Sequence, residues 1–513
     1  MASQYRDNHL APSGPGLASE PKSSISERQS GDTRMSDCIN YKLFINGTWR
    51  SGGTGADLPV INPATEMEFG RVAVASASDL DDCLRSAQAS LHFWANTPAE
   101  ERGELLIRAA RILKGKMDVA AAALSREQGK TLTEAKGEYA RAVEMIEWNG
   151  AQAAKLSAPW PIDPERLLIP EAIGVVAAFT PWNYPAVLNA RKLAASIVAG
   201  CPVILKAAEE TPSAGVHMIE ALQEAGIPPG VVSLVFGNPP MISEYLLGSS
   251  LVRALSFTGS TPVGRQLAKF AANNLQRCVL ELGGHSPVVV FGDADLTKAI
   301  SAISEYKFEC AGQSCNAPSR ILVEKSIYKE FLARLVQAAE KIRVGAPDDP
   351  NVDMGPMANS RRVEAMERLT KDAVDRGARV ETGGKRIDRP GYYWSPTILS
   401  NVPPGSQVLR EEPFGPILTV APFSAIEEAI EEANATEYGL ASYFFTESPE
   451  IQKRMIRSLS AGAISLNHLK GVSADAPNAG IKQSGYGYEG GVEGVRAFQI
   501  LKLVNGAKAV PLA

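Results

Sequence analysis

The chain has 513 residues, of which 45% are hydrophobic and 21% are charged, a composition typical of a globular protein with more than one core. Its formal net charge is only -5, and lysine and arginine are scattered, so the sequence offers no basic stripe for nucleic acid or an anionic membrane. The longest apolar stretch, about 167–188, is interrupted by Pro170, Glu171 and Pro181, which argues against a membrane span. We expect a soluble protein of two large domains.

The N-terminal segment, residues 1–40, is polar and rich in Ser, Gly and Pro, which predicts a disordered tail in which Met35 could be a second start. Its acidic residues fit neither a secretory signal nor a transit peptide. Six cysteines without a CxxC pair favour reduced thiols in the cytoplasm over a disulfide framework. The five histidines show no ligand spacing, so we predict no metal site.

Regular structure is expected from Tyr41, where Asn46-Gly47 stands between two short segments of strand-forming residues and predicts a hairpin with a type I′ turn. Apolar residues then recur at helical spacing over 78–153. Within this region, Thr97-Pro98-Ala99-Glu100 predicts a capping box at the start of a helix.

Short apolar runs alternate with helical stretches over 173–291, and a second alternation runs from Val288 to about residue 445. Strands and helices that alternate at this spacing are typical of a parallel sheet with both faces covered by helices. The sequence therefore predicts an α/β protein with two parallel-sheet units.

Three side chains are candidates for catalysis. Cys315 lies among small and polar residues, a setting that lets a thiol reach the thiolate, whereas Cys310 is better explained as a buried structural cysteine. Glu281 ends an apolar strand before a glycine pair and could be a general base. Asn183, held between two prolines, could donate an amide N–H to a developing oxyanion. Taken singly, the three also fit a buried thiol, a surface-turn acid and a loop cap.

A dinucleotide site is indicated directly after the predicted strand that ends at Phe257. There Gly259, Ser260 and Gly264 mark a glycine turn and the start of a helix, whose free N–H groups and positive dipole end suit a pyrophosphate. The segment is not the usual GxGxxG, so alone it carries little weight. Lys206 and Glu209 follow another predicted strand, where they could bind ribose hydroxyls or simply be solvated.

Taken together and in order, these segments resemble the aldehyde dehydrogenase superfamily from about Tyr41 to Val504, closest to its NAD-dependent semialdehyde dehydrogenases. The motifs that carry the resemblance are PWNYP around Asn183, KAAEETP from Lys206, FTGSTPVG ending at Gly264, LELGG containing Glu281, GQSC ending at Cys315, EEPFGP containing Glu412 and Phe414, and SGYGYEGG containing Glu489. Chance agreement of seven motifs in register is negligible, whereas any one of them would be only a hypothesis.

The resemblance implies that an aldehyde is oxidised to a carboxylic acid through a thioester on Cys315. The oxyanion of the preceding thiohemiacetal would be held by the Asn183 amide and the Cys315 backbone N–H. Glu281 would deprotonate the water that hydrolyses the thioester, and Lys192 and Glu489 would carry the proton outwards.

The resemblance also implies a nicotinamide cofactor. Glu412 would bind the nicotinamide ribose, Phe414 would pack near the ring, and Trp182 would lie beside the cofactor through its backbone with its ring in the core. We expect NAD rather than NADP, because the Glu209 carboxylate would accept hydrogen bonds from the adenosine ribose and repel a 2′-phosphate, an effect that Lys206 offsets in part.

The fold implied by the resemblance has two Rossmann-like parallel-sheet domains and a small bridging β-sheet for oligomerisation. The NAD-binding domain is expected at 41–151 and 171–282, the catalytic domain at 283–467, and the bridging segments at 152–170 and 468–513. Because a projecting edge strand is normally covered by another subunit, we expect a homodimer or homotetramer.

The predicted substrate depends mainly on Arg191, whose position is also arginine in semialdehyde and lactaldehyde dehydrogenases of this family. An arginine suits an anionic or hydroxylated aldehyde, and succinic semialdehyde is the first candidate. Glu309 stands where those semialdehyde enzymes carry a second arginine. If Glu309 faces the pocket, it favours lactaldehyde or an aminoaldehyde; if it pairs with Arg191, the pocket is nearly neutral. Arg191 could also pair with an acid elsewhere, and an aromatic aldehyde is a further alternative.

The sequence departs from the family pattern at Ala207, usually proline, at His285, often lysine, and at 477–480, where PNAG replaces PFGG near the substrate entrance. No departure removes a catalytic group. A CoA-acylating dehydrogenase typically lacks the base, so Glu281 argues against that alternative. Retention of Cys315, Glu281 and Asn183 argues against a non-catalytic structural member of the family.

Overall fold

The computed structural model describes residues 39–469 and 473–506. The predicted tail, with Met35, lies outside these ranges apart from residues 39 and 40. Those two residues belong to strand β1 (Ile39–Tyr41), which pairs in parallel with β5 (Met67–Ala73), so order begins earlier than the predicted Tyr41. The strand has only three residues, too few to form a hydrophobic pattern, which is why the sequence did not reveal it.

The first large sheet has eight strands within the described ranges, in the order β20-β12-β11-β8-β9-β10-β2-β3. Its five central strands run parallel, as predicted from the alternating apolar runs. The strands are β8 (Val175–Phe179), β9 (Val203–Lys206), β10 (Val232–Val235), β11 (Val252–Thr258) and β12 (Arg277–Glu281), flanked by β2 (Leu43–Ile45), β3 (Thr48–Arg50) and β20 (Gly485–Tyr486).

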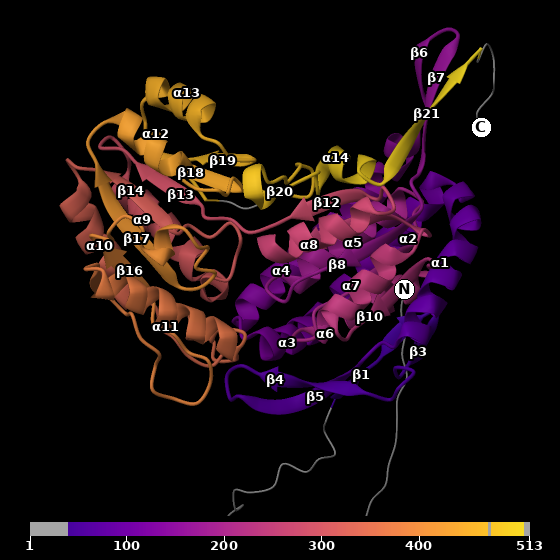
Figure 1. The fold of residues 1–513 in the computed structure, drawn as a ribbon, viewed down its shortest axis with the longest axis horizontal. Coiled ribbons are helices and arrows are strands. Elements are labelled where there is room, and N and C mark those ends of the chain that lie inside the picture. Colours follow the sequence, from indigo (N-terminus) through magenta and orange to yellow (C-terminus); the bar gives the residue numbers. More distant parts are fainter. Residues whose placement is uncertain (1–38, 470–472, 507–513) are drawn as a thin grey trace, which may run out of the picture. The chain divides into compact units, whose positions relative to one another are not determined.

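Helices cover this sheet, drawn from indigo to magenta in Figure 1. They are α1 (Ala77–Asn96), α2 (Ala99–Gly115), α3 (Met117–Gln128), α4 (Leu132–Ser157), α5 (Pro185–Val198), α6 (Pro212–Ala225), α7 (Pro239–Gly248) and α8 (Thr261–Ala272). The core between helices and sheet consists of the apolar faces that the helical spacing predicted.

Local turn and cap chemistry was predicted correctly at one position and wrongly at another. Asn46 and Gly47 have φ angles of 49° and 80° and join β2 to β3 in an antiparallel hairpin, as expected of a type I′ turn. The predicted capping box does not form, because the Thr97 hydroxyl donates to the carbonyl of Phe93 in the preceding helix. A capping box forms instead at Thr131, which caps α4.

The second large sheet has seven strands within the described ranges, in the order β15-β16-β17-β14-β13-β18-β19. The strands are β13 (Pro287–Val290), β14 (Arg320–Glu324), β15 (Arg379–Thr382), β16 (Thr397–Ser400), β17 (Ile417–Phe423), β18 (Ala441–Phe445) and β19 (Ala463–Leu466). They pack against α9 (Leu296–Phe308), α10 (Tyr328–Glu340), α11 (Ser360–Asp375), α12 (Ile426–Asn434) and α13 (Pro449–Ser458), drawn mainly in orange (Figure 1). The chain therefore has the two parallel-sheet units that its sequence predicts.

Two three-stranded sheets complete the fold: β1-β5-β4, with β4 (Asp57–Asn62), and β21-β7-β6, formed by β6 (Trp160–Asp163), β7 (Arg166–Ala172) and β21 (Gln499–Asn505). Figure 1 shows the second one standing apart from the large sheets, where a bridging sheet was expected. The boundary proposed at 151–152 falls inside α4, however, and 468–513 also supplies β20 and α14 (Gly491–Arg496). Among the described residues, no helix is long and apolar enough to cross a membrane.

Candidate active site

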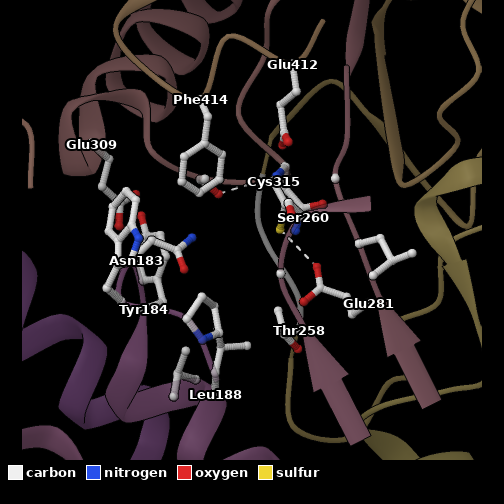
Figure 2. A pocket seen from close by; sticks show the side chains of 18 of the residues that line it. Asn183, Tyr184, Leu188, Thr258, Ser260, Glu281, Glu309, Cys315, Glu412 and Phe414 are labelled. Atoms are coloured by element: carbon white, nitrogen blue, oxygen red, sulfur yellow. Dashed lines mark hydrogen bonds between the residues drawn. The ribbon is translucent and has the colours of Figure 1, made fainter. Parts of the chain in front are cut away.

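A cavity of about 1200 Å³ is lined by residues of both sheet units, including Asn183, Glu281, Cys315 and Glu412. Asn183 follows β8 and Glu281 ends β12, so both lie at the carboxyl ends of parallel strands, where ligands of such sheets bind. Figure 2 shows Cys315 joined to Glu281 by a hydrogen bond, with Glu412 and Phe414 above the thiol in this view. The fold therefore brings Cys315, Glu281 and Asn183 to one cavity, together with most of the predicted cofactor residues. The other predicted site residues do not line it: Lys192, Lys206, Glu209, Gly264 and Glu489.

The Cys315 thiol donates a hydrogen bond of 3.0 Å to Oε1 of Glu281. Glu281 is buried, and its backbone carbonyl accepts from the Gly259 N–H at 3.0 Å, which ties the base to the predicted dinucleotide turn. Gly284 permits the close approach of the Cys315 loop, because a Cβ at Gly284 would lie 2.3 Å from the Cys315 carbonyl oxygen. This contact explains the glycine pair after Glu281.

Burial and the negative charge of Glu281 hold the pKa of the Cys315 thiol well above its ordinary value. Burial and the charge of Glu489 likewise raise the pKa of Glu281. The polar setting that the sequence suggested does not lower the pKa of the thiol. Instead, the thiol donates to the Glu281 carboxylate, which is the group placed to accept its proton.

Asn183 is held from both its side chain and its backbone. Its Nδ2 donates to the carbonyl of Gln313 at 2.9 Å, next to the Cys315 loop, and its Oδ1 has no hydrogen-bond partner among the described residues. Its backbone carbonyl accepts from Nζ of Lys130 at 2.8 Å. The amide is thus fixed beside the nucleophile loop, as an oxyanion donor must be.

The sequence did not reveal Lys130 and Glu138, which form an ion pair with both side chains fully buried. Oε1 of Glu138 accepts from the Ala186 backbone N–H at 2.7 Å at the start of α5, while Lys130 holds the Asn183 carbonyl. The pair therefore fixes the loop that carries Asn183. Helical spacing around Glu138 indicated only an interior helix position, which gives no sign of a partner outside the helix.

A second buried pair joins Lys192 and Glu489, the predicted proton path. Nζ of Lys192 donates to Oε1 of Glu489 and, at 3.1 Å, to the Ser256 hydroxyl. Arg191 joins the same group, with its NH1 3.8 Å from Oε2 of Glu489. Arg191 lines the cavity, yet its charge is offset by this acid, which is the pairing left open by the sequence.

Glu309 also lines the cavity, but it pairs with Arg141 and not with Arg191. The N–O distance between Arg141 and Glu309 is 3.6 Å. Arg141 projects from the middle of α4 and was not among the predicted site residues, because a polar residue on a long helix is usually only solvated. Of the two arrangements considered for Glu309, the structure has the one in which it faces the pocket.

Glu412 and Phe414 line the cavity together with Trp182. Oε1 of Glu412 accepts from the Gly284 N–H at 3.0 Å, and burial raises the pKa of Glu412 to about 8. Phe414 has a positive φ of 46°, and its ring packs edge-on against Trp182 with centroids 5.6 Å apart. The Trp182 ring is therefore half-buried at the cavity, and the expectation that it lies in the core is wrong.

At the other predicted cofactor position, Nζ of Lys206 lies 2.7 Å from Oε2 of Glu209, whose Oε1 accepts from the Gly237 N–H at 2.8 Å. Ser260 precedes α8 without using its side chain as a cap, and Gly264 packs so tightly that a Cβ would lie 2.3 Å from Leu282. These glycines, the free helix start and the Glu209 carboxylate fit a dinucleotide.

Asn359 gives a further indication that this region fits the cofactor. Its amide is buried, and neither Nδ2 nor Oδ1 has a hydrogen-bond partner among the described residues. Asn359 lines both the main cavity and a smaller one of about 400 Å³ that also contains Glu209. Buried polar atoms normally have partners, so an unpaired amide between the two cavities favours a polar ligand there.

Two of the departures from the family pattern have structural roles. His285 is buried, its Nδ1 lies 2.6 Å from the Ser319 hydroxyl, and burial holds the pKa of the imidazole well below its ordinary value, so it stays neutral. Asn478, in the loop that replaces PFGG, pairs with Glu489 through two backbone hydrogen bonds of 2.6 and 2.9 Å. That loop therefore positions Glu489, one of the two residues of the predicted proton path.

A sequence model described as the aldehyde dehydrogenase family matches residues 49–504. The chain is 41% identical to 4-(hydroxymethyl)benzenesulfonate dehydrogenase of Comamonas testosteroni over 90% of this chain and 98% of that one. It is 36% identical to the NADP(+) succinate-semialdehyde dehydrogenase of Escherichia coli strain K12 over 91% and 98%. It is also similar to a crystal structure of succinate-semialdehyde dehydrogenase from Burkholderia pseudomallei, with a TM-score of 0.89 and 35% identity over 92% and 99%.

Proposed function

The chain belongs to the aldehyde dehydrogenase family of oxidoreductases, and we propose that it oxidises an aldehyde to a carboxylic acid with NAD through a thioester on Cys315. The observation that carries the proposal is the 3.0 Å hydrogen bond from the Cys315 thiol to Glu281 at the wall of a cavity. A nucleophile in direct contact with a buried base is the arrangement that covalent catalysis needs.

In the acylation half, the Cys315 proton passes to Glu281 while Sγ bonds to the aldehyde carbon. The carbonyl oxygen becomes an oxyanion, held by Nδ2 of Asn183 and the backbone N–H of Cys315. NAD, when bound, supplies the acceptor for the hydride that leaves this carbon as the thioester forms. Glu412, Phe414 and the turn at Gly259 would hold it, in keeping with their position on the cavity wall.

In the deacylation half, Glu281 first releases the proton that it took from Cys315, and it then takes a proton from the water that adds to the thioester carbonyl. The C–S bond then breaks, the acid is released, and the Cys315 thiolate takes back a proton from Glu281. Glu489 affects the pKa of Glu281 and binds Lys192, so these two residues offer the proton a way out of the buried site. The contact between Lys192 and Glu489 supports this proton path.

NAD is proposed over NADP because of Glu209; family members bind either cofactor. Two like charges about 4 Å apart repel by up to about 4 kcal/mol at an effective dielectric near 20. Lys206 offsets part of this repulsion of a 2′-phosphate. Glu209→Ser should therefore shift the ratio of kcat/KM values for the two cofactors towards NADP by at least about tenfold. Equal efficiency of the unmodified enzyme with both cofactors would overturn the choice of NAD.

We propose an aldehyde that carries an anionic group as substrate, with succinic semialdehyde as the first candidate. The relatives named for a sulfonate and for succinate semialdehyde support this class. Glu309 at the cavity favours a second candidate, an aminoaldehyde, and lactaldehyde is a third. NADH formation should be compared, as kcat/KM, for succinic semialdehyde, lactaldehyde, an aminoaldehyde and benzaldehyde. A kcat/KM at least tenfold higher for benzaldehyde or the aminoaldehyde would rule out the proposal of an anionic substrate.

We also infer a homodimer or homotetramer and a cytoplasmic location. Leu501 and Leu503 on β21 are half-exposed, and an apolar edge strand of this kind suits contact with a second copy. The reduced thiol that Cys315 requires fits a reducing compartment. Light scattering on the purified protein would decide the assembly, and a monomeric mass would contradict it.

A further inference from the structure

Arg141 and Arg191 both line the cavity that contains Cys315, but their surroundings differ. Arg191 is only 7% exposed, and its guanidinium lies 3.8 Å from the buried carboxylate of Glu489. This contact is too long for a hydrogen bond, and Nε of Arg191 is buried without a hydrogen-bond partner among the described residues. Arg191 is therefore a buried arginine of the cavity wall, whereas Arg141 is an exposed one.

The Arg141 side chain is 44% exposed and has donors to spare. Its nearest charged partner, Glu309, lies 3.6 Å away, which is too far for a hydrogen bond. Its guanidinium carbon is 5.9 Å from the centre of the Tyr184 ring, on the loop that carries Asn183. An arginine has five N–H donors arranged to hold a carboxylate or sulfonate at two points.

We propose that Arg141 binds the anionic group of the substrate; the inference rests on the proposed oxidation of an aldehyde at Cys315. The loose contact between Arg141 and Glu309 opens when the substrate's carboxylate or sulfonate replaces the Glu309 carboxylate. Glu305, exposed one helical turn earlier at the same cavity, adds negative charge there. The negative charges of Glu305 and Glu309 weaken anion binding, so the attraction of the anion to Arg141 has to exceed their repulsion.

Apolar side chains indicate what kind of segment joins the aldehyde to the anionic group of the substrate. Val187, Leu188 and Leu469 line the same cavity and are buried. A substrate with its aldehyde at Cys315 and its anion at Arg141 would pass these side chains with an apolar segment. The site therefore suits an aldehyde linked by a hydrocarbon spacer, aliphatic or aromatic, to a carboxylate or sulfonate.

The test measures kcat/KM with NAD for two matched pairs of substrates: succinic semialdehyde against butanal, and 4-carboxybenzaldehyde against benzaldehyde. Arg141→Ala should lower the anionic-to-neutral ratio at least tenfold in the preferred pair, mainly through KM. Glu309→Gln should raise the same ratio severalfold, because the competing carboxylate is gone. Arg141→Lys should restore part of the ratio.

Lys136→Ala is the matched control, since Lys136 lies on the same helix and pairs with Asp118 outside the cavity lining. Its ratio should equal that of the unmodified enzyme. An unchanged ratio in Arg141→Ala would overturn the inference. If the unmodified enzyme oxidised none of the four aldehydes at a rate that depends on Cys315, the proposed function would fail instead, so the two failures are distinct.

Discussion

Cys310 and Cys315 lie in the same loop, but only one of them meets a base. Cys310 is buried, with Nε2 of Gln128 donating to its sulfur at 3.2 Å and its own thiol directed to the Asn183 carbonyl at 3.6 Å. Cys315 lines the cavity and directs its thiol to the Glu281 carboxylate. Burial raises the pKa of Cys310 to about 12 and that of Cys315 well above its ordinary value.

A raised pKa therefore does not tell the nucleophile from the structural cysteine. What differs is the acceptor: a carbonyl oxygen cannot keep a proton at neutral pH, whereas a carboxylate with a raised pKa can. The region around Cys310, with the buried pair Lys130–Glu138, holds the Asn183 backbone. The chemistry is proposed for the region around Cys315.

The largest expected effect is that of Cys315→Ser. Because an alkoxide is much harder to form than a thiolate, turnover should fall by at least about 1000-fold. The affinity for NAD, measured by fluorescence titration, should stay close to that of the unmodified enzyme. If this variant kept its activity, the two cysteines would have been assigned the wrong way round.

Disrupting the buried pair Lys130–Glu138 should lower both the free energy of unfolding and kcat. Lys130→Met leaves Glu138 as an uncompensated buried charge, so denaturant unfolding should show a loss of about 3–5 kcal/mol. Adding Glu138→Gln should recover part of the stability but not kcat, since the Asn183 carbonyl still lacks its Lys130 donor. Full recovery of kcat in the double variant would show that Lys130 does not position Asn183.

The pH profile offers a smaller effect. A protonated Glu281 cannot accept a proton, so kcat/KM should rise with pH through the raised pKa of this group. Glu489→Gln removes one cause of the raised pKa and should move the acid limb to lower pH by roughly one unit or less. A shift to higher pH, or none, would mean that Glu281 does not set this limb.

The smallest effect is expected for Cys310→Ser, which keeps a donor towards the Asn183 carbonyl. Turnover should stay within about twofold of the unmodified value, since no reacting atom is touched. Steady-state NADH formation is the measurement. A collapse of activity with intact folding would give Cys310 a catalytic part.

The sequence predicts the sheets and the principal residues of the candidate site because each leaves a local pattern. The central strands follow from short apolar runs, and Cys315, Glu281 and Asn183 each stand in a recognisable motif. Hydrophobic spacing says which face of a helix is buried but not which distant segment it meets. For that reason Glu138 and Arg141, both on α4, could not be assigned to the site.

The sequence also did not predict contacts between residues that lie far apart in the chain. Arg191 lines the cavity as expected of a substrate residue, but its contact with Glu489, near the other end of the chain, was not predicted. The Trp182 ring packs against Phe414, whose positive φ is a backbone conformation that non-glycine residues seldom adopt. Neither contact leaves a local pattern, so only the folded structure reveals them.

The central claim, a thioester on Cys315 that Glu281 helps to hydrolyse, is tested most directly by rapid mixing of Glu281→Gln with NAD and succinic semialdehyde. The account predicts an early burst of NADH followed by turnover slower by about 100-fold or more, with the acyl group found on Cys315 by peptide mass spectrometry. Loss of the burst in proportion to the steady rate, with unmodified Cys315, would contradict it and show that Glu281 acts mainly before the thioester forms.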